Sequence, residues 1–348
     1  MAALVQPDSR FIQEVMARGG ADLKKCYQCA TCSVVCQLAP EEAPFPRKQM
    51  IAAQWGLKER LVADPAIWLC HHCGDCTTEC PRGARPGDVL GALRAAAIRH
   101  FAFPGWLGSL AASPRGLPLL LLLPVLIFSG MVLAAGPPHA GEMEFAHLFP
   151  IARLEALFFC VAALALLAFA IGAIRFVRAL RAAGANGNIG AGLVPALKEI
   201  ATHARFAQCG QAARSRRLGH LLTLWAFLGL AVMGTVVGLG TMTGLMRTPL
   251  PLLHPLKLFA NLCAVVILIG SVILLADRLR DPAARAASTY FDWLFLWTLL
   301  GVVLTGIASE LLRLAQTSVM YGVYFVHLVL VFALFLYAPY TKFAHLLY

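Results

Sequence analysis

Two groups of four cysteines lie in the first quarter of the chain. Each has the spacing Cys-x2-Cys-x2-Cys-x3-Cys: Cys26, Cys29, Cys32 and Cys36, then Cys70, Cys73, Cys76 and Cys80. Three thiolates at this spacing wrap a short loop around one corner of an iron–sulfur cubane. A zinc site would instead need Cys-x2-Cys pairs separated by a dozen or more residues. The spacing therefore predicts two [4Fe-4S] clusters.

The fourth cysteine of each group is expected to serve the other cluster, as in two-cluster ferredoxins. This rule assigns Cys26, Cys29, Cys32 and Cys80 to the first cluster, and Cys70, Cys73, Cys76 and Cys36 to the second. Pro81 follows Cys80 as is common, but Gln37 follows Cys36, so the crossing of Cys36 is the less regular one. His71 and His72 do not have a Rieske spacing and are expected to be exposed or to neighbour the cluster without binding it.

Four histidines in the apolar second part of the chain are candidate haem ligands. His345 follows His327 by 18 residues. On a continuous helix this separation is about five turns, or about 27 Å, so both rings would share one face, although Pro339 between them would kink the helix. His220 begins an apolar run and is expected at the same depth in the membrane as His345. His254 precedes another apolar run and is expected at the same depth as His327. The expected ligand pairs are therefore His220 with His345 and His254 with His327.

Each of these histidines has a structural alternative as a hydrogen-bonded packing residue or an interfacial residue. Histidine is costly inside lipid, which makes a functional role the default interpretation for a residue such as His327. His254 has the most competition, because His139 and His147 belong to the same side of the predicted bundle. We expect His100 and His203 to be solvated loop residues.

Lys257 is a candidate catalytic residue next to the predicted ligand His254. It lies three residues after His254, so a helix that begins there places the two side chains near one face. Its ammonium could polarise a carbonyl oxygen of a bound apolar substrate, and Glu310 near the end of another apolar run could relay protons. The alternatives are a lysine that extends to the membrane surface or binds lipid, and a solvated carboxylate at a helix end.

Composition indicates which elements position these residues. The 348 residues are 59% hydrophobic and only 14% charged, with a mean hydropathy of +0.72, whereas soluble proteins carry roughly a quarter charged residues. Six apolar runs come close to the ~20 residues needed to cross a bilayer: 117–135, 151–174, 218–241, 255–276, 291–312 and 319–338. The predicted fold is all-α. A helical ferredoxin domain (1–105), with a helical pattern over 46–62, precedes a six-helix membrane bundle (106–348).

Charge predicts the orientation of this bundle. Residues 1–105 are nearly neutral, with 12 basic and 10 acidic residues, whereas residues 106–348 have 17 basic and 8 acidic residues. Of these 17 basic residues, 13 fall on one side of the predicted membrane and 4 on the other. The positive-inside rule therefore places both termini in the cytoplasm, in a cytoplasmic (inner) membrane. Basic residues that lie beside apolar runs favour contact with membrane lipid over binding of nucleic acid. The loop 175–217 is expected to form a helix on the membrane surface or to dock a partner.

Cysteine usage agrees with a cytoplasmic location for the first domain. The chain begins without the basic and then apolar pattern of a signal peptide. Dense cysteine in a reducing compartment favours metal ligation over disulfides. No Cys-x-x-Cys-His sequence is present, so any haem is expected to be a non-covalent b-type haem.

Two parts of the sequence resemble known families. The last apolar run, with His327, Pro339-Tyr340-Thr341-Lys342-Phe343 and His345, resembles the final helix of the cytochrome b (gamma) subunit of respiratory nitrate reductases. His220 matches that family's proximal-haem histidine. The family has a second histidine ten residues later, where this chain has Leu230, so His254 is our inference for the partner of His327. The N-terminal part resembles the iron–sulfur subunit of heterodisulfide reductase.

The fusion of these two parts is similar to the membrane subunit of quinone-interacting membrane-bound oxidoreductase complexes. This resemblance implies two b haems, exchange with menaquinone or ubiquinone, flavin-containing partner subunits and electron traffic with adenylylsulfate reductase. One alternative is a membrane subunit of a heterodisulfide-reductase-like or sulfite-pathway complex. Another is a transporter with a redox-sensing ferredoxin domain, but the chain has neither the internal repeat nor the charge relay typical of transporters.

Overall fold

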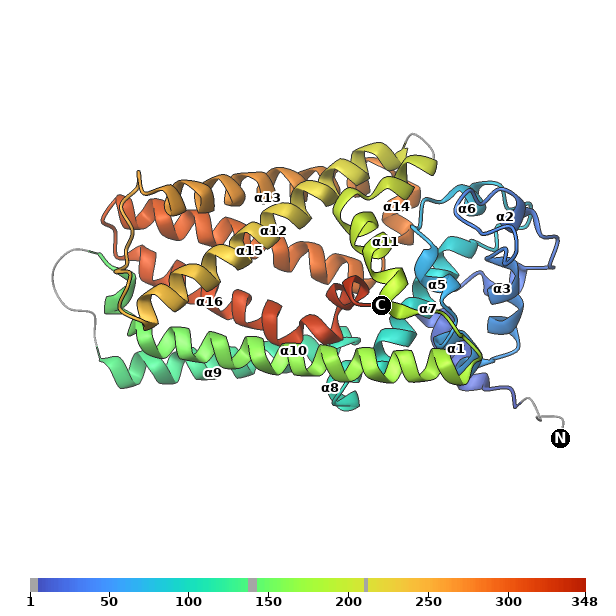
Figure 1. The fold of residues 1–348 in the computed structure, drawn as a ribbon, viewed down its shortest axis with the longest axis horizontal. Coiled ribbons are helices and arrows are strands. Elements are labelled where there is room, and N and C mark those ends of the chain that lie inside the picture. The colour runs from blue at the N-terminus through green and yellow to red at the C-terminus, as the bar shows by residue number, and fades with distance from the viewer. Residues whose placement is uncertain (1–5, 137–142, 210–211) are drawn as a thin grey trace.

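The computed structural model describes residues 6–136, 143–209 and 212–348, and in these ranges it contains helices and no strands. The predicted all-α class is confirmed. Short helices of the N-terminal part gather at one end of a bundle of long helices, and the C-terminus lies beside them (Figure 1).

The N-terminal part consists of short helices because its chain is interrupted repeatedly by cysteine loops, glycine and proline. Its elements are α1 (Ser9–Ala17), η1 (Leu23–Lys25), α2 (Thr31–Val34), α3 (Arg47–Gln54), α4 (Lys58–Val62), α5 (Ala66–Leu69), α6 (Asp75–Thr78) and α7 (Pro86–Phe101). The longest of them, α7, has Pro86 in its first turn, where the missing N–H costs nothing. It is buried along most of its length and forms the centre of this part. The next helix, α8 (Gly105–Ala111), packs against the bundle.

Among the residues that the structure describes, six helices are long and apolar enough to cross a membrane, as the sequence predicts. They are α9 (Leu117–Ala135), α10 (Ile151–Ala182), α12 (Ala212–Met242), α13 (Pro255–Arg280), α15 (Tyr290–Leu314) and α16 (Val319–Tyr337). Their outward faces carry exposed apolar side chains such as Leu133, Leu166 and Val232. Because a large exposed apolar surface is not stable in water, lipid is the environment that this bundle fits.

Shorter elements precede, connect and follow these helices. The loop after α10 contains a helix, as expected for 175–217. In the described ranges these shorter elements are η2 (Pro114–Gly116), η3 (Phe145–His147), α11 (Ile189–Thr202), η4 (Ala204–Gln208), α14 (Pro282–Ala287), η5 (Ala338–Tyr340) and η6 (Lys342–Leu346). Helix α11 and η4 lie beside the end of the bundle that carries the N-terminal part (Figure 1).

The helical pattern predicted over 46–62 is present as two helices, α3 and α4, because Gly56 adopts a φ of +67° between them. A Cβ atom at Gly56 would lie 2.5 Å from the carbonyl oxygen of Asp8, so only glycine fits there. His327 and His345 do not share one helix, since α16 ends at Tyr337 and His345 belongs to η6. The five-turn argument therefore does not apply to them.

The N-terminal part and the bundle share one hydrophobic core. Phe176 of α10 belongs to the same buried cluster as Phe101 of α7. The ring of Trp68 stacks on Tyr348, with centroids 5.1 Å apart. The guanidinium of Arg175 donates to the carbonyl oxygens of Phe101 and Ala102 at 3.1 and 2.8 Å, where a cation also complements the C-terminal end of α7. The two parts are therefore packed as one unit.

Candidate redox centres

The first cavity lies between the loop before α2 and the loop after α6. It has a volume of about 320 Å³. Four cysteines line it: Cys26, Cys29, Cys32 and Cys80. These are the four that the crossing rule assigns to the first cluster. Ala30, with a φ of 70°, turns the chain into α2 and so directs Cys32 inward.

The second cavity lies between α6, α7 and the loop that follows α2. It has a volume of about 350 Å³. Four cysteines line it: Cys36, Cys70, Cys73 and Cys76. Cys36 thus faces the second cysteine group, although Gln37 stands where proline is common. The two cavities divide the eight cysteines as the crossing rule divides them.

The donor set fits multi-iron clusters better than single ions. Within the described residues, no three His, Cys, Asp or Glu side chains converge as they would around one metal ion. The thiols instead surround a volume, as the outer corners of a cubane require. Burial raises the pKa of Cys32 to about 11 and also raises the pKa of Cys36 and Cys76. Several thiolates would be unstable in these positions unless the positive charge of bound iron compensated them.

Hydrogen bonds to the sulfur atoms come from several donors. Gln28 Nε2 lies 3.2 Å from Cys26 Sγ, and the backbone N–H of Ala84 lies 3.3 Å from Cys80 Sγ. At the exposed Cys29, the hydroxyl of Thr31 lowers the pKa of the thiol. Such donors stabilise negative charge on sulfur and are one means by which proteins set cluster potentials.

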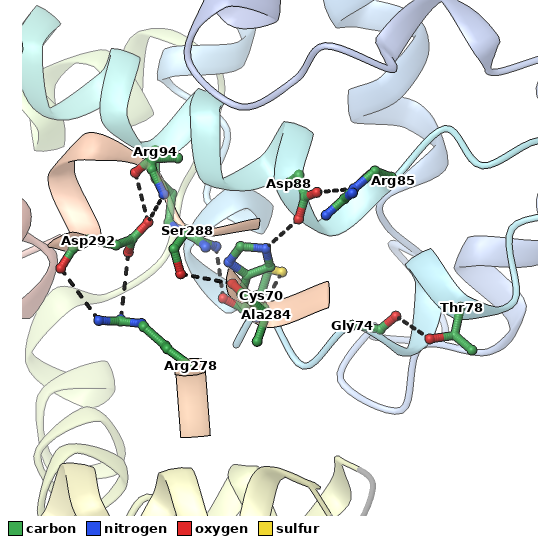
Figure 2. A network of polar contacts seen from close by, with 12 residues as sticks. Cys70, Gly74, Thr78, Arg85, Asp88, Arg94, Arg278, Ala284, Ser288 and Asp292 are labelled. Atoms are coloured by element: carbon green, nitrogen blue, oxygen red, sulfur yellow. Dashed lines mark hydrogen bonds and ion pairs between the residues drawn. The ribbon is translucent and has the colours of Figure 1, made fainter. Parts of the chain in front are cut away.

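A polar network holds the loop of the second cysteine group. Arg94 donates a hydrogen bond to the carbonyl oxygen of Cys70 at 2.8 Å (Figure 2). Arg85 Nε donates a hydrogen bond to one carboxylate oxygen of Asp88 at 2.5 Å (Figure 2). The other carboxylate oxygen of Asp88 lies 2.8 Å from His72 Nε2. The backbone N–H of His72 in turn lies 3.3 Å from Cys70 Sγ. His72 therefore lies beside the second cavity as a hydrogen-bonded neighbour.

The structure brings His220 of α12 and His345 of η6 together. Their ring centroids are 6.0 Å apart. Two imidazoles that bind one iron through Nε2, at about 2 Å each, would have centroids roughly 6 Å apart. His345 Nδ1 donates to the carbonyl oxygen of Lys342 at 2.5 Å, and His220 Nδ1 lies 2.7 Å from His203 Nε2. Both Nδ1 atoms are thus engaged, which leaves the Nε2 atoms to act as ligands.

The expectation that His203 is a solvated loop residue is wrong. Its side chain is only 8% exposed, because α11 folds back so that the indole N–H of Trp225 reaches the carbonyl oxygen of Ala201 at 3.1 Å. Burial lowers the pKa of His203, so its neutral ring can accept a hydrogen bond from His220 Nδ1. No sequence periodicity indicates this contact, since it depends on how a long loop returns to the bundle. His100, also expected in a loop, lies on α7.

In the described part of the chain, His254 and His327 make hydrogen bonds with different residues. His327 Nδ1 lies 3.0 Å from the carbonyl oxygen of Val302 on α15. His254 caps α13, and its Nδ1 accepts the backbone N–H of Leu256 at 3.3 Å. The two histidines therefore have separate partners. Of the two alternatives, His147 lies in η3, and His139 lies outside the described residues.

Lys257 and Glu310 meet at the far end of the bundle. Lys257 Nζ lies 3.0 Å from one carboxylate oxygen of Glu310, and Arg313 Nη2 lies 3.0 Å from the other. The side chains of Lys257 and Glu310 are only 22% and 15% exposed. Glu310 is therefore not a solvated carboxylate, and Lys257 does not extend freely to the surface. A lysine–glutamate pair between two membrane-length helices is an arrangement that can exchange protons.

Comparisons with known proteins identify the N-terminal part. Residues 22–84 match the family model described as a 4Fe-4S dicluster domain. The C subunit of the H(2):CoB-CoM heterodisulfide,ferredoxin reductase of Methanothermobacter thermautotrophicus is 37% identical over 84 residues, which are 24% of this chain and 45% of that protein. A protein of Archaeoglobus profundus that is similar to the C subunit of heterodisulfide reductase is 35% identical over 105 residues, 30% of this chain and 54% of that protein. The chain thus spans about half the length of these relatives.

A further similarity extends into the membrane-length helices. The citrate utilization protein B of Escherichia coli is 29% identical over 309 residues, which are 80% of this chain and 77% of that protein. No solved structure matches. The dicluster match confirms the expectation of two [4Fe-4S] clusters. The chain therefore joins a dicluster domain, similar to the C subunit of heterodisulfide reductase, to six candidate membrane helices.

Proposed function

We propose that the chain is the membrane electron-transfer subunit of a quinone-interacting oxidoreductase. It passes electrons between menaquinone or ubiquinone and a soluble partner through two b haems and two [4Fe-4S] clusters. One observation carries this proposal: the cysteine-lined second cavity and the His220–His345 pair lie in one packed unit at the same end of the bundle. Electrons could therefore pass between the dicluster domain and the membrane without a separate carrier protein.

We assign the ligands by the pairs and sets expected from the sequence. The first cluster takes Cys26, Cys29, Cys32 and Cys80, and the second takes Cys36, Cys70, Cys73 and Cys76. His220 and His345 bind the haem nearer the clusters, and the observed engagement of both Nδ1 atoms supports this pair. His327 binds the second haem, and His254 remains the proposed partner, with His147 as the next candidate. A haem held by two imidazoles supplies one-electron chemistry.

Lys257 is the proposed residue for quinone chemistry at the far end of the bundle. Its ammonium retains donors besides the one directed at Glu310, so it can bind a quinone carbonyl oxygen as negative charge develops there. Glu310 can hold or release the proton that accompanies each electron. Both side chains are mostly shielded from water, which strengthens these interactions.

The proposed partners are flavin-containing, heterodisulfide-reductase-like subunits, with adenylylsulfate reductase as the enzyme that they serve. The similarity of the dicluster domain to the C subunit of a heterodisulfide reductase supports the first part of this proposal. A second candidate is a membrane subunit of another heterodisulfide-reductase-like or sulfite-pathway complex. The similarity to C subunits of heterodisulfide reductases supports this alternative equally, and the similarity to a citrate utilization protein, over 80% of the chain, gives no support to adenylylsulfate reductase as the enzyme served.

The test is purification of the protein with its co-migrating subunits, followed by a dithionite-reduced minus oxidised absorbance spectrum. We expect a b-type haem signal, two [4Fe-4S] EPR signals and haem reduction by a quinol analogue. His220→Ala and His345→Ala should remove the same haem, and His327→Ala should remove the other. Absence of any b-type haem from a preparation that retains both clusters would overturn the proposal.

A further inference from the structure

We infer that the segment His203–Cys209 is a bridge that couples the second cluster, and not the first, to the His220–His345 site. This inference rests on the proposed function, because it requires a haem at that histidine pair. The segment consists of η4 with one residue on either side, and it belongs to the loop between the second and third membrane-length helices.

At the membrane end, the bridge contacts a proposed haem ligand directly. His203 Nε2 lies 2.7 Å from His220 Nδ1, and the two ring centroids are 4.6 Å apart. For His220 to bind iron through Nε2, its Nδ1 must carry the proton and His203 Nε2 must accept the hydrogen bond. His203 is thus a positioning residue for His220.

In the middle of the bridge, Phe206 connects the two sides. Its ring stacks on His203 with centroids 5.6 Å apart, and it lies 4.5 Å from the ring of His71. His71 is next to Cys70 in the sequence and lines the second cavity. Arg216 lies over the same phenyl ring at 5.7 Å and donates to the carbonyl oxygen of His72 at 2.9 Å. A continuous series of packed rings therefore leads from the second cavity to His220.

At the cluster end, the bridge reaches both sides of the second cavity. Cys209 is buried and belongs to the same packed cluster as Cys73. Arg205 donates to the carbonyl oxygen of Leu38 at 2.9 Å, two residues after Cys36. Within the described residues, the hydrogen bonds and ring contacts of this segment include no residue that lines the first cavity. The first cluster is therefore left to face the soluble partner.

The step across the bridge is a one-electron transfer. With a cluster held by Cys36, Cys70, Cys73 and Cys76 and a haem held by His220 and His345, one electron would be given up at the cluster and taken up at the haem iron, so the two changes of oxidation state would balance. No covalent bond forms or breaks and no proton moves, and the opposite direction is the same step reversed. Electron tunnelling depends on the gap between the redox centres and on how well atoms fill it. The bridge fills this gap with aromatic rings in contact.

The test is Phe206→Leu in the full chain within its complex. Leucine retains an apolar side chain but removes the aromatic contact with His71 and His203. We expect both cluster EPR signals and the haem spectrum to persist, while electron equilibration between haem and cluster after rapid mixing with a quinol analogue slows severalfold. Trp297→Leu is the control, because Trp297 stacks on Trp293 with centroids 6.4 Å apart and lies outside the bridge. It should equilibrate at the wild-type rate.

Two further variants keep the inference testable if Phe206→Leu does not assemble. Cys209→Ser should alter the EPR signal of the second cluster and leave that of the first unchanged. His203→Leu should shift the midpoint potential of the haem at His220. His203→Gln retains a hydrogen-bond acceptor and should bring the potential part of the way back to the wild-type value. A change in the first cluster's signal, or a wild-type equilibration rate in Phe206→Leu, would overturn the bridge. Absence of haem from the wild-type protein would instead overturn the proposed function.

Discussion

At the scale of single residues, the contacts around the proposed ligands serve to hold them in one state. His345 is fixed through its Nδ1 by the carbonyl oxygen of Lys342, and the Nζ of Lys342 is ion-paired with Asp292 of α15. Asp292 also caps its own helix through the backbone N–H of Thr289, and Arg278 approaches the same carboxylate (Figure 2). A ligand on an irregular C-terminal segment is thereby tied to two membrane-length helices.

The first residue-scale prediction concerns the crossing of ligands between the cysteine groups. Cys36 lines the second cavity with Cys73, so Cys36→Ser should alter the same EPR signal as Cys73→Ser. The physical reason is that a serine oxygen is a harder ligand than a thiolate and changes one corner of that cluster alone. EPR spectra of the two reduced variants provide the measurement. An altered first-cluster signal in Cys36→Ser would contradict the crossing.

The second residue-scale prediction concerns the anchor of His345. Asp292→Asn removes the charge that compensates Lys342 and Arg278 and should destabilise the C-terminal segment by roughly 1–3 kcal/mol. We expect a lower melting temperature and partial loss of the haem at His220 and His345, measured by the ratio of haem to protein. Glu42→Gln, at an exposed residue, is the control. Full haem content in Asp292→Asn would show that Asp292 does not anchor the ligand.

At the scale of elements, glycines decide how closely the membrane-length helices approach one another. A Cβ atom at Gly270 of α13 would lie 2.8 Å from the carbonyl oxygen of Gly219 of α12. A Cβ atom at Gly306 of α15 would lie 2.9 Å from Cε1 of His327 on α16. The second contact means that the ring of His327 occupies the space that any larger side chain would need. Helix spacing and ligand position are therefore linked.

The element-scale prediction follows from this contact. Gly306→Ala should displace the ring of His327 or separate α15 from α16, at a cost of about 1–3 kcal/mol for overpacking. We expect the haem at His327 to be lost or its potential to shift, while the haem at His220 and His345 is unchanged. Redox titration of the haem absorbance measures both. Gly322→Ala on α16 is the matched control, since a Cβ atom there meets nothing within 4 Å.

At the scale of the whole molecule, the dicluster domain, the C-terminus and α11 lie at one end of the bundle (Figure 1). Lys257, Glu310 and Arg313 lie toward the other end, where α13 begins and α15 ends. If the clusters face the cytoplasm, the proposed quinone site lies near the opposite membrane surface. The two proposed haems, one at each level, would then divide the span of the membrane between them.

The whole-molecule prediction is the orientation of the protein. The excess of basic residues on the side of the dicluster domain should hold both termini in the cytoplasm. A fluorescent protein fused after Tyr348 should be fluorescent, and alkaline phosphatase fused after Gly244, between α12 and α13, should be active because this enzyme requires the periplasm. A dark fusion after Tyr348 together with inactive alkaline phosphatase after Gly244 would place the clusters outside the cytoplasm. That result would contradict the proposed partners.

The sequence by itself determined the elements and the chemical types of their residues. Six apolar runs had to be helices of membrane length, because backbone groups in lipid must satisfy one another within a helix. Eight cysteines at cubane spacing were sufficient for two clusters, because the local loop geometry depends on spacing alone. These properties are local or repeat along the chain, so they can be recognised without knowing which segments meet.

Only the tertiary structure decided which residues meet across long sequence separations. It paired Lys257 with Glu310 and ended α16 before His345. It also buried His203 against His220 and brought Cys209 to Cys73, although both residues belong to a loop that the sequence characterises only as basic and partly helical. Contacts of this kind depend on how α11 folds back against the bundle, and the energy of that packing is spread over many weak contacts that leave no periodic pattern in the sequence.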